Sequence, residues 1–257
     1  MPPIIDVIRH AEATHNTTGN VNQQDPDLTP NGEAQASKLG RSYAFKPRIT
    51  HVVSSPMRRA IRTALIAFED VLSEGEGKKV VLLPELQETG VRPSDTGQSP
   101  EALEMAFGPR VDTSPLDSDW CHKDRNSKYF PDVALVEARA REARVFLRDL
   151  ARRGPDDAHI VVVSHGGFIH FLTEDFSGLW ERYFTSYGNT TMRSFQFVDL
   201  RGDDDPDARM VQTHESCRLS RVPRYMDMSE EEKARCRAPA VARVEWQKRD
   251  FEYLMEG

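Results

Sequence analysis

Three observations on the sequence predict an α/β protein built on a buried sheet. Two short runs rich in β-branched residues, 4–8 and 159–163, have the length of buried strands. Each run passes abruptly into polar residues that include a histidine, and open α/β sheets carry their chemistry at such strand ends. The chain has 257 residues, 38% of them apolar, and can therefore bury a full core in one domain.

The segments between these two runs alternate between helix and strand patterns. We expect a helix over 31–43, where apolar residues recur at helical spacing, and then a strand over 50–53. A helix from Pro56 to about Leu72 should follow, because proline is tolerated in the first turn of a helix. A short strand over 80–83 completes this half of the chain.

Residues 89–132 are the least regular part of the sequence, with several prolines and aromatic residues. Such a long, loop-rich insertion is typical of a lid or a pocket wall. Trp120 and Phe130 fit a core position and a pocket wall equally well. After the insertion, 133–153 is the clearest helix of the chain, and we expect its many charged residues to face solvent.

The C-terminal part predicts two more strands and a long helix. Residues 194–200 alternate as a strand does, and 210–222 can return as an edge strand. Ser229 and Glu232 have the spacing of a capping box, which predicts a helix that reaches about Leu254.

The polar residues at the strand ends predict an anion site. Arg9 presents a fork of permanently charged donors suited to phosphate or carboxylate, and His10 beside it can act as a neutral nucleophile near pH 7. His165 follows the second strand, and the helix after Pro56 carries Arg59 in its first turn, where the helix dipole also favours an anion. The spacing alone fits another interpretation of Arg9 and His10 equally well: a surface arginine and a histidine whose hydrogen bonds are made within the protein.

Together these motifs resemble the histidine phosphatase superfamily, in its phosphoglycerate mutase-like branch. The resemblance covers about residues 4 to 200 and departs from the usual pattern at Ala11, Ala13 and His15; Ala13 lacks a hydroxyl that often helps to hold phosphate. The motifs follow the family's order: Arg9-His10-Ala11-Glu12 through Asn16, 27–36, Ser55-Pro56-Met57-Arg58-Arg59-Ala60, Leu86-Gln87-Glu88 and Ser164-His165-Gly166-Gly167.

The resemblance implies an α/β three-layer sandwich, whose mostly parallel central sheet is flanked by helices, with a lid-like insertion. It implies a single domain over 1–257, in which 89–132 form a lid or substrate-pocket insertion and 201–257 form a C-terminal extension.

The resemblance also assigns roles to individual residues. It implies a covalent phosphohistidine at His10 and a proton donor at Glu88, for which phosphate charge would raise the pKa of the carboxyl group. Glu85 lacks the matched spacing, and a solvated charge at a strand end explains it. The implied catalytic residues are His10, Glu88 and His165, and the implied phosphate contacts are Arg9, Asn16 and Arg59. Arg9, Arg59 and His165 are expected to supply the positive charge of the phosphate site.

We expect neither a metal ion nor another cofactor. His15 and His170 suggest a metal site together with His10 and His165, but neighbouring arginines repel a cation. Arg58 and Arg62, on the same helix as Arg59, are expected to face solvent or to pair with acids.

Three functions remain open from the sequence. The first is a phosphomonoester hydrolase that acts on a small phosphorylated metabolite, and the second is a phosphoglycerate mutase-type phosphotransferase. Mutases resemble this chain at the nucleophile but usually carry Glu-Arg-His-Tyr-Gly after the acid. Here the run is Glu88-Thr89-Gly90-Val91-Arg92, which favours the hydrolase. The third is a repurposed family member that uses the same pocket for different chemistry.

The net charge of the chain restricts the partners that we expect it to bind. A formal net charge of −7 argues against nucleic acid or an anionic membrane as the main partner, so we expect a small phosphorylated substrate, with a homodimer left open. No apolar segment approaches the roughly 18 residues of a membrane-spanning helix. The N-terminus enters a strand without a signal-peptide pattern, which predicts a soluble, cytoplasmic protein.

Overall fold

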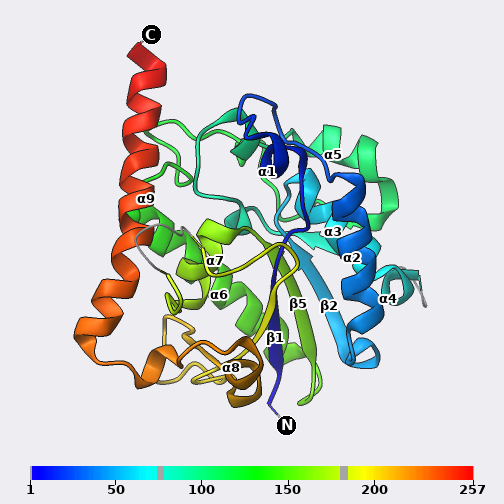
Figure 1. Cartoon of the computed structure of the whole chain (residues 1–257). Helices are drawn as coiled ribbons and strands as arrows, with labels where there is room; N and C mark the ends of the chain where they lie inside the picture. Colours follow the sequence, from blue (N-terminus) through cyan, green and yellow to red (C-terminus); the bar gives the residue numbers. More distant parts are fainter. Residues whose placement is uncertain (1, 74–77, 180–184, 257) are drawn as a thin grey trace.

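The computed structural model describes residues 2–73, 78–179 and 185–256. Within these ranges the centre of the molecule is a sheet with the strand order β4-β3-β2-β5-β1-β6-β7 (Figure 1). The first five strands run parallel: β1 (Ile4–Arg9), β2 (Ile49–Ser54), β3 (Val80–Leu82), β4 (Val111–Asp112) and β5 (His159–Ser164). The last two, β6 (Met192–Phe197) and β7 (Met210–Gln212), add antiparallel pairings at one edge.

Helices cover both faces of the sheet, which confirms the predicted three-layer sandwich. One face carries α2 (Pro30–Ser42), α3 (Arg58–Ala67) and α4 (Glu69–Ser73); the other carries α6 (Val133–Arg153), α7 (Gly166–Thr173) and part of α9 (Glu230–Glu256) (Figure 1). Shorter helices lie outside these layers: α1 (Thr14–Thr18), α5 (Pro100–Phe107) and α8 (His214–Ser220). None of the described helices is long and apolar enough to cross a bilayer.

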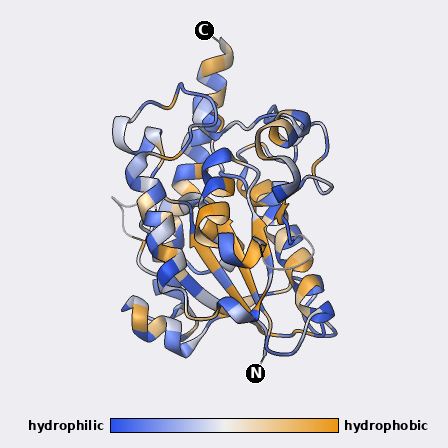
Figure 2. Ribbon diagram, turned by 90° about the vertical axis from the view of Figure 1, so that its right-hand side faces the viewer, coloured by the Kyte–Doolittle hydropathy of each residue, from blue (hydrophilic) through white to orange (hydrophobic). Residues whose placement is uncertain are grey.

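Alternation along the strands divides the core into two clusters. Ile5 and Val7 of β1 pack toward α6 and α7, whereas Ile8 packs toward α3. Because successive side chains of a strand point to opposite faces, a strand covered on both sides is apolar at most positions, and the buried Asp6 of β1 is hydrogen-bonded to Tyr43, His159 and Ser194. The strands accordingly form the apolar centre of the ribbon, with the polar surfaces of the helices outside (Figure 2).

Two predicted elements differ from the structure by the most in their bounds. The helix expected from Pro56 begins at Arg58, because Met57 keeps an extended backbone (φ −72°, ψ 135°) and forms the N-cap. It also ends at Ala67, and α4 follows as a separate short helix. The edge strand expected over 210–222 ends at Gln212, where the Thr213 side chain accepts a hydrogen bond from the Ser216 N–H and starts α8.

Helix α6 has the predicted bounds, but the expectation that its charges face solvent is wrong for three arginines. Arg139, Arg144 and Arg148 are buried and donate to backbone carbonyl groups of neighbouring segments, which for Arg144 is helix α7. Arg139 Nη1 lies 2.7 Å from the Gln87 oxygen, and Arg148 Nη1 lies 2.5 Å from the Asp205 oxygen. Since a guanidinium group has five N–H donors, it can satisfy loop carbonyls that would otherwise be buried without partners.

The 89–132 insertion is part of the folded core as well as a wall of the site. It contains α5 and strand β4, which the sequence reading missed and which pairs with β3. Trp120 is fully buried in the core cluster on the α3 side. Phe130 is buried as well and meets Phe251 of α9 edge-on, with ring centroids 5.2 Å apart. The insertion therefore joins the sheet to the C-terminal helix.

Close packing of α2 on α3 gives a first prediction, at Gly40. A Cβ atom on Gly40 would lie 2.1 Å from the Ala67 carbonyl oxygen, so one backbone would have to move. We expect Gly40→Ala to lower the free energy of unfolding by about 1–3 kcal/mol in urea titrations, although alanine is the better helix former. Gly154→Ala is the control, because its Cβ would make an ordinary 3.5 Å contact with Ala158. Equal stability of the two variants would contradict the packing argument.

Candidate active site

The site is created by three adjacent parallel strands that end at the same edge of the sheet. β5 lies between β1 and β2, with Arg9 in register with Ser164. His10 follows β1, Ser55 follows β2 and His165 follows β5, so these side chains meet above the sheet edge. The ring centroids of the two histidines are 5.1 Å apart. The predicted meeting of two imidazoles is thus a consequence of strand order.

His10 is held as a neutral base with its lone pair directed into the site. Its Nδ1 lies 2.7 Å from the Ala11 carbonyl oxygen, and since a carbonyl only accepts, Nδ1 carries the proton. Nε2 therefore keeps the lone pair, and the Nε–H of Arg59 donates to it at 3.3 Å. Burial, followed by the charge of Arg59, holds the pKa of His10 well below its usual value.

His165 is neutral as well, which differs from the cationic role that the sequence predicts. Its Nε2 lies 2.7 Å from Ser55 Oγ, and this oxygen also accepts from the Met57 N–H at 3.4 Å. The Ser55 hydroxyl proton has no other acceptor among the described residues, so we assign it to His165 Nε2, which places the histidine proton on Nδ1. Burial and the charge of Arg59 hold the pKa of His165 well below its usual value. His165 can donate to an anion, but the positive charge of the site comes from arginines.

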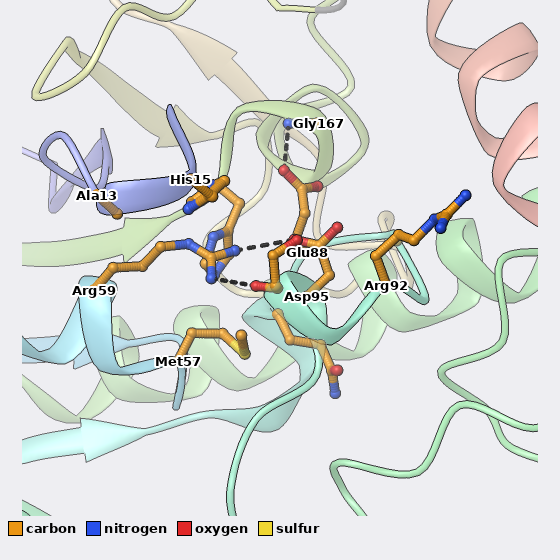
Figure 3. A network of polar contacts seen from close by, with 12 residues as sticks. Ala13, His15, Met57, Arg59, Glu88, Arg92, Asp95 and Gly167 are labelled. Atoms are coloured by element: carbon orange, nitrogen blue, oxygen red, sulfur yellow. Dashed lines mark hydrogen bonds and ion pairs between the residues drawn. The ribbon is translucent and has the colours of Figure 1, made fainter. Parts of the chain in front are cut away.

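Arg59 reaches the site from the first turn of α3 and is almost completely buried. Besides its contact with His10, its Nη1 donates to the Ser94 carbonyl oxygen at 2.7 Å, and its Nη2 pairs with Asp95 Oδ1 at 3.1 Å (Figure 3). These contacts use three of the five N–H groups of the guanidinium. Ser94 and Asp95 belong to the insertion, which therefore fixes the position of the arginine.

Arg9, at the end of β1, approaches the same site from the opposite side. Its Nη1 donates to the Tyr187 carbonyl oxygen at 2.8 Å, whereas its Nε is buried and has no hydrogen-bond partner among the described residues. Burial lowers the pKa of Arg9 from its usual value, and the charge of Arg59 lowers it further, but an arginine remains charged at neutral pH. The buried Nε–H is a donor that an anion can satisfy.

Asn16 does not reach the arginines in this structure. It is exposed on α1, its Oδ1 accepts from the Ala13 N–H at 3.0 Å, and its Nδ2 lies 3.0 Å from His15 Nε2. His15 instead faces the site, with its ring centroid 6.1 Å from that of His10 (Figure 3). The predicted phosphate contact of Asn16 thus needs a rotation of its side chain, while His15 already lines the pocket.

The four histidines considered as metal ligands do not converge. His170 lies apart from the other three, where its Nδ1 contacts the Asp175 carbonyl oxygen at 2.7 Å. Among residues 2–73, 78–179 and 185–256, no group of histidine, cysteine and acidic side chains has the geometry of a metal site. Arg58 and Arg62 pair with Asp27 at 2.9 and 3.2 Å, as the sequence predicts.

Glu88 lies on the other side of the pocket as a buried carboxylate. Its Oε2 accepts from the Gly167 N–H at 3.1 Å (Figure 3), its Oε1 accepts from the Thr89 N–H at 2.9 Å, and Arg243 Nη2 lies 3.9 Å from Oε2. Burial alone would raise the pKa of Glu88, but the charge of Arg243 and the two N–H donors outweigh it and lower the pKa to about 2. The protein groups therefore favour the ionised form, opposite to the effect expected from phosphate charge.

Two buried cations that the sequence reading missed hold the segment around Glu88. Lys123 Nζ donates to the carbonyl oxygens of Glu88, Gly90 and Asp95 at 2.9, 2.7 and 2.6 Å. Burial lowers the pKa of Lys123 to about 7, but three carbonyl acceptors match the three protons of an ammonium ion, so we assign it the charged form. Arg139 Nη1 donates to the carbonyl oxygens of Glu85 and Gln87, which come just before Glu88 in the chain. No local motif marks a lysine in an irregular loop as such a residue.

Glu85 is outside this pocket. Its carboxylate is buried, so the expectation of a solvated charge is wrong, and it pairs with Lys128 Nζ at 2.7 Å. Glu85 and Glu88, the two candidate proton donors in the sequence, thus lie in different environments.

Comparison with known proteins identifies the family. The family model described as histidine phosphatase superfamily (branch 1) matches residues 5–203. The chain belongs to the histidine phosphatase superfamily. The predicted family is therefore confirmed. Membership in this family also confirms the predicted enzyme class, a histidine phosphatase. The match ends before α8 and α9 begin.

Individual relatives agree with this assignment. The histidine phosphatase described here is 26% identical to "Putative phosphoserine phosphatase 2" of Hydrogenobacter thermophilus, over 72% of this chain and 86% of the relative. It is 29% identical to a phosphoglycerate mutase-like protein of Arabidopsis thaliana, over 76% of this chain and 84% of the relative. The crystal structure of the ecdysone phosphate phosphatase from Bombix mori in complex with tungstate has the same fold, with a TM-score of 0.51, 17% identity and coverage of 76% and 89% of the two chains.

The buried histidines of this histidine phosphatase predict a loss of stability in mild acid. Burial lowers the pKa of the following four from the usual 6.5: His10, His15, His165 and His170. Below about pH 6.5 the unfolded chain therefore binds more protons than the folded chain, and the free energy of unfolding falls as the pH falls. Each histidine contributes up to about 1.4 kcal/mol per pH unit.

Urea unfolding between pH 7 and pH 5 measures this dependence. The pKa of His15 is lowered to about 3. His15→Gln should therefore reduce the dependence of the free energy of unfolding on pH by the contribution of one histidine. His122→Gln is the control and should leave the slope unchanged, because that side chain is 65% exposed. A pH-independent free energy of unfolding would refute the assigned protonation states.

Proposed function

We propose that this histidine phosphatase hydrolyses phosphomonoesters of small metabolites through a phosphohistidine at His10. The observation that carries the proposal is the buried, neutral imidazole whose Nδ1 proton is fixed on a carbonyl group, so that Nε2 is the nucleophile. Arg59 donates to this nitrogen, and Arg9 lies near enough for its charge to lower the pKa of His10; both guanidinium groups are suited to the charge of a phosphoryl group. Family membership supports the same class of reaction.

In the first step, Nε2 of His10 attacks phosphorus while the bond to the leaving oxygen breaks. Arg9, Arg59 and the Nδ1–H of His165 would contact the three remaining oxygens of the phosphoryl group, which is where charge accumulates in the transition state. The arrangement needs no metal ion, because the guanidinium groups supply the positive charge. Glu88, on the far side of the pocket, would face the leaving oxygen.

Because the protein groups favour the ionised form of Glu88, we infer that the proton for the leaving oxygen arrives with the substrate. A phosphate monoester has its second pKa near 6, so part of it carries one proton in mild acid. Glu88 can take this proton and pass it to the leaving alkoxide. In the second step, Glu88 accepts a proton from water, the water oxygen attacks phosphorus, and the bond to His10 breaks to release inorganic phosphate.

Hydrolysis fits the structure better than mutase chemistry. Arg92 follows the acid in sequence but turns away from Arg59 toward α9 (Figure 3), where its Nε lies 2.6 Å from Asp250 Oδ2. It therefore contributes no charge to hold a phosphorylated intermediate for return of the phosphoryl group. A family member repurposed for different chemistry would not form a phosphohistidine at His10. The cytoplasmic location and the homodimer stay predictions from the sequence.

Removal of the nucleophile gives the decisive test. His10→Ala should lower turnover of para-nitrophenyl phosphate by at least about 10³-fold, because the remaining groups bind phosphate without forming the covalent bond. Denaturation in alkaline detergent during turnover of radiolabelled substrate should trap a phosphoprotein that is stable in base and labile in acid in the wild type, and none in the variant. The exposed His122→Ala variant should keep both signals. A His10→Ala variant that keeps a tenth of the wild-type rate would exclude His10 as the nucleophile.

The proton-donor role of Glu88 predicts dependence on the leaving group. Glu88→Gln should cost about 10²- to 10⁴-fold with an alkyl phosphate, whose alkoxide needs a proton, and much less with para-nitrophenyl phosphate. Glu85→Gln is the control and should show neither loss, because that carboxylate pairs with Lys128 outside the pocket. Equal losses with both substrates would assign Glu88 to pocket organisation instead.

A further inference from the structure

The N-terminus of α3, where the sequence predicts an anion, is occupied by a carboxylate of the protein itself. Asp25 Oδ1 accepts from the Arg58 N–H at 3.0 Å, in the first turn of the helix. The partial positive charge of a helix N-terminus stabilises a negative group at this position. Arg58 directly precedes Arg59, so a second acidic group lies beside the arginine that contacts His10.

The insertion holds both Asp25 and Arg59 in place. The Asp25 N–H donates to the Pro93 carbonyl oxygen at 3.1 Å, and Arg59 Nη1 donates to the carbonyl oxygen of the next residue, Ser94, at 2.7 Å. Asp25 has a φ of 41°, a left-handed conformation that aspartate and asparagine tolerate better than most side chains. The carboxyl group and the guanidinium group are therefore fixed by adjacent residues of one segment.

The carboxyl group of Asp25 is buried and only partly satisfied. The residue is 2% exposed, and its Oδ2 has no hydrogen-bond partner within residues 2–73, 78–179 and 185–256. Burial removes the hydration of this oxygen, and no described N–H group replaces it, so a negative charge there is costly. A change in the surrounding charge can therefore change the protonation state of Asp25.

Charged groups on three segments face Asp25 and its arginine neighbours. Arg58 and Arg59 of α3 favour the ionised carboxylate, whereas Asp27 on the same loop disfavours it. Asp95 of the insertion pairs with Arg59 (Figure 3). Burial raises the pKa of Asp25 to about 7, although the arginines oppose this effect. Near neutral pH the folded protein thus contains both forms of Asp25.

We propose that Asp25 is a positioning residue for Arg59, which takes up a proton from solvent when a doubly charged phosphoryl group binds this arginine. The inference rests on the proposed function, in which Arg59 contacts the phosphoryl oxygens. In the free enzyme, ionised Asp25 offsets part of the charge of Arg58 and Arg59. A bound dianion takes over this role and repels the carboxylate, which then binds one proton. The proton returns to solvent when inorganic phosphate leaves.

Sulfate isolates this coupling, because it is a dianion that does not itself titrate near neutral pH. Calorimetric titration in buffers of different ionisation enthalpy counts the protons taken up with sulfate. Asp25→Asn keeps the oxygen that accepts from the Arg58 N–H but cannot ionise, so at about pH 7.5 it should take up fewer protons than the wild type, by up to one. From pH 6.5 to 9, wild-type sulfate affinity should fall about 3- to 10-fold more than that of the variant.

Asp27→Asn is the matched control, two residues further along the same loop. Burial alone would raise the pKa of Asp27, but the hydrogen bond from Arg58 at 2.9 Å outweighs it and lowers the pKa. Asp27 therefore stays ionised over this range of pH. Its substitution should change the sulfate affinity by the same factor at every pH and leave the proton uptake at the wild-type value. Proton uptake common to all three proteins belongs to other buried groups.

Three results would overturn the inference. An affinity that falls by the same factor at every pH in Asp25→Asn would leave Asp25 with a structural role only. If this variant does not fold, the wild type decides by itself, and sulfate binding without proton uptake between about pH 7 and 8 contradicts the coupling. Sulfate that does not compete with para-nitrophenyl phosphate would mean that no dianion rests on Arg59.

The proposed function and the role of Asp25 fail in different ways. A wild type that forms the phosphohistidine and hydrolyses para-nitrophenyl phosphate, but shows no proton uptake that depends on Asp25, refutes the role of Asp25 alone. A wild type that neither forms the phosphohistidine nor hydrolyses any phosphomonoester refutes the proposed function, and the inference with it.

Discussion

The parallel pairing of β5 between β1 and β2 is the constraint on which the site depends. Parallel strands deliver their carboxyl ends to one edge, so residues more than a hundred positions apart become neighbours. The His10 N–H donates to the Ser164 carbonyl oxygen at 2.9 Å, which continues the ladder of hydrogen bonds one residue past β1. His10, the proposed nucleophile, is thereby fixed by the backbone of the sheet.

Burial at this edge determines how charge is distributed. Histidines enclosed by protein and close to arginines stay neutral, because a protonated imidazole there would lose its hydration and be repelled by its neighbours. His10 therefore keeps a lone pair for attack, and His165 acts as a neutral donor. The arginines carry the positive charge, which suits them because guanidinium groups remain protonated even when buried.

The acid side of the pocket is built differently, from loops that buried cations hold in place. Lys123 binds three carbonyl oxygens between Glu88 and Asp95, and Arg139 binds those of Glu85 and Gln87. Asp95 in turn pairs with Arg59, so the positions of the Glu88 carboxylate and of the Arg59 guanidinium are coupled through one segment. Irregular backbone buried at this depth needs such donors, because water cannot satisfy its carbonyl groups.

The sequence by itself determined the fold class, the strand ends and the motif residues His10, Arg59, Glu88 and His165. These features are encoded locally, by β-branched runs, by turn residues and by short motifs, and the meeting of strand ends then follows from parallel pairing. Only the tertiary structure decided the ionisation of Glu88, the position of Asn16 away from the arginines and the entry of Arg243 into the site. These depend on contacts between distant segments, such as that between Arg92 and Asp250, 158 positions apart, which leave no periodicity or motif in the sequence.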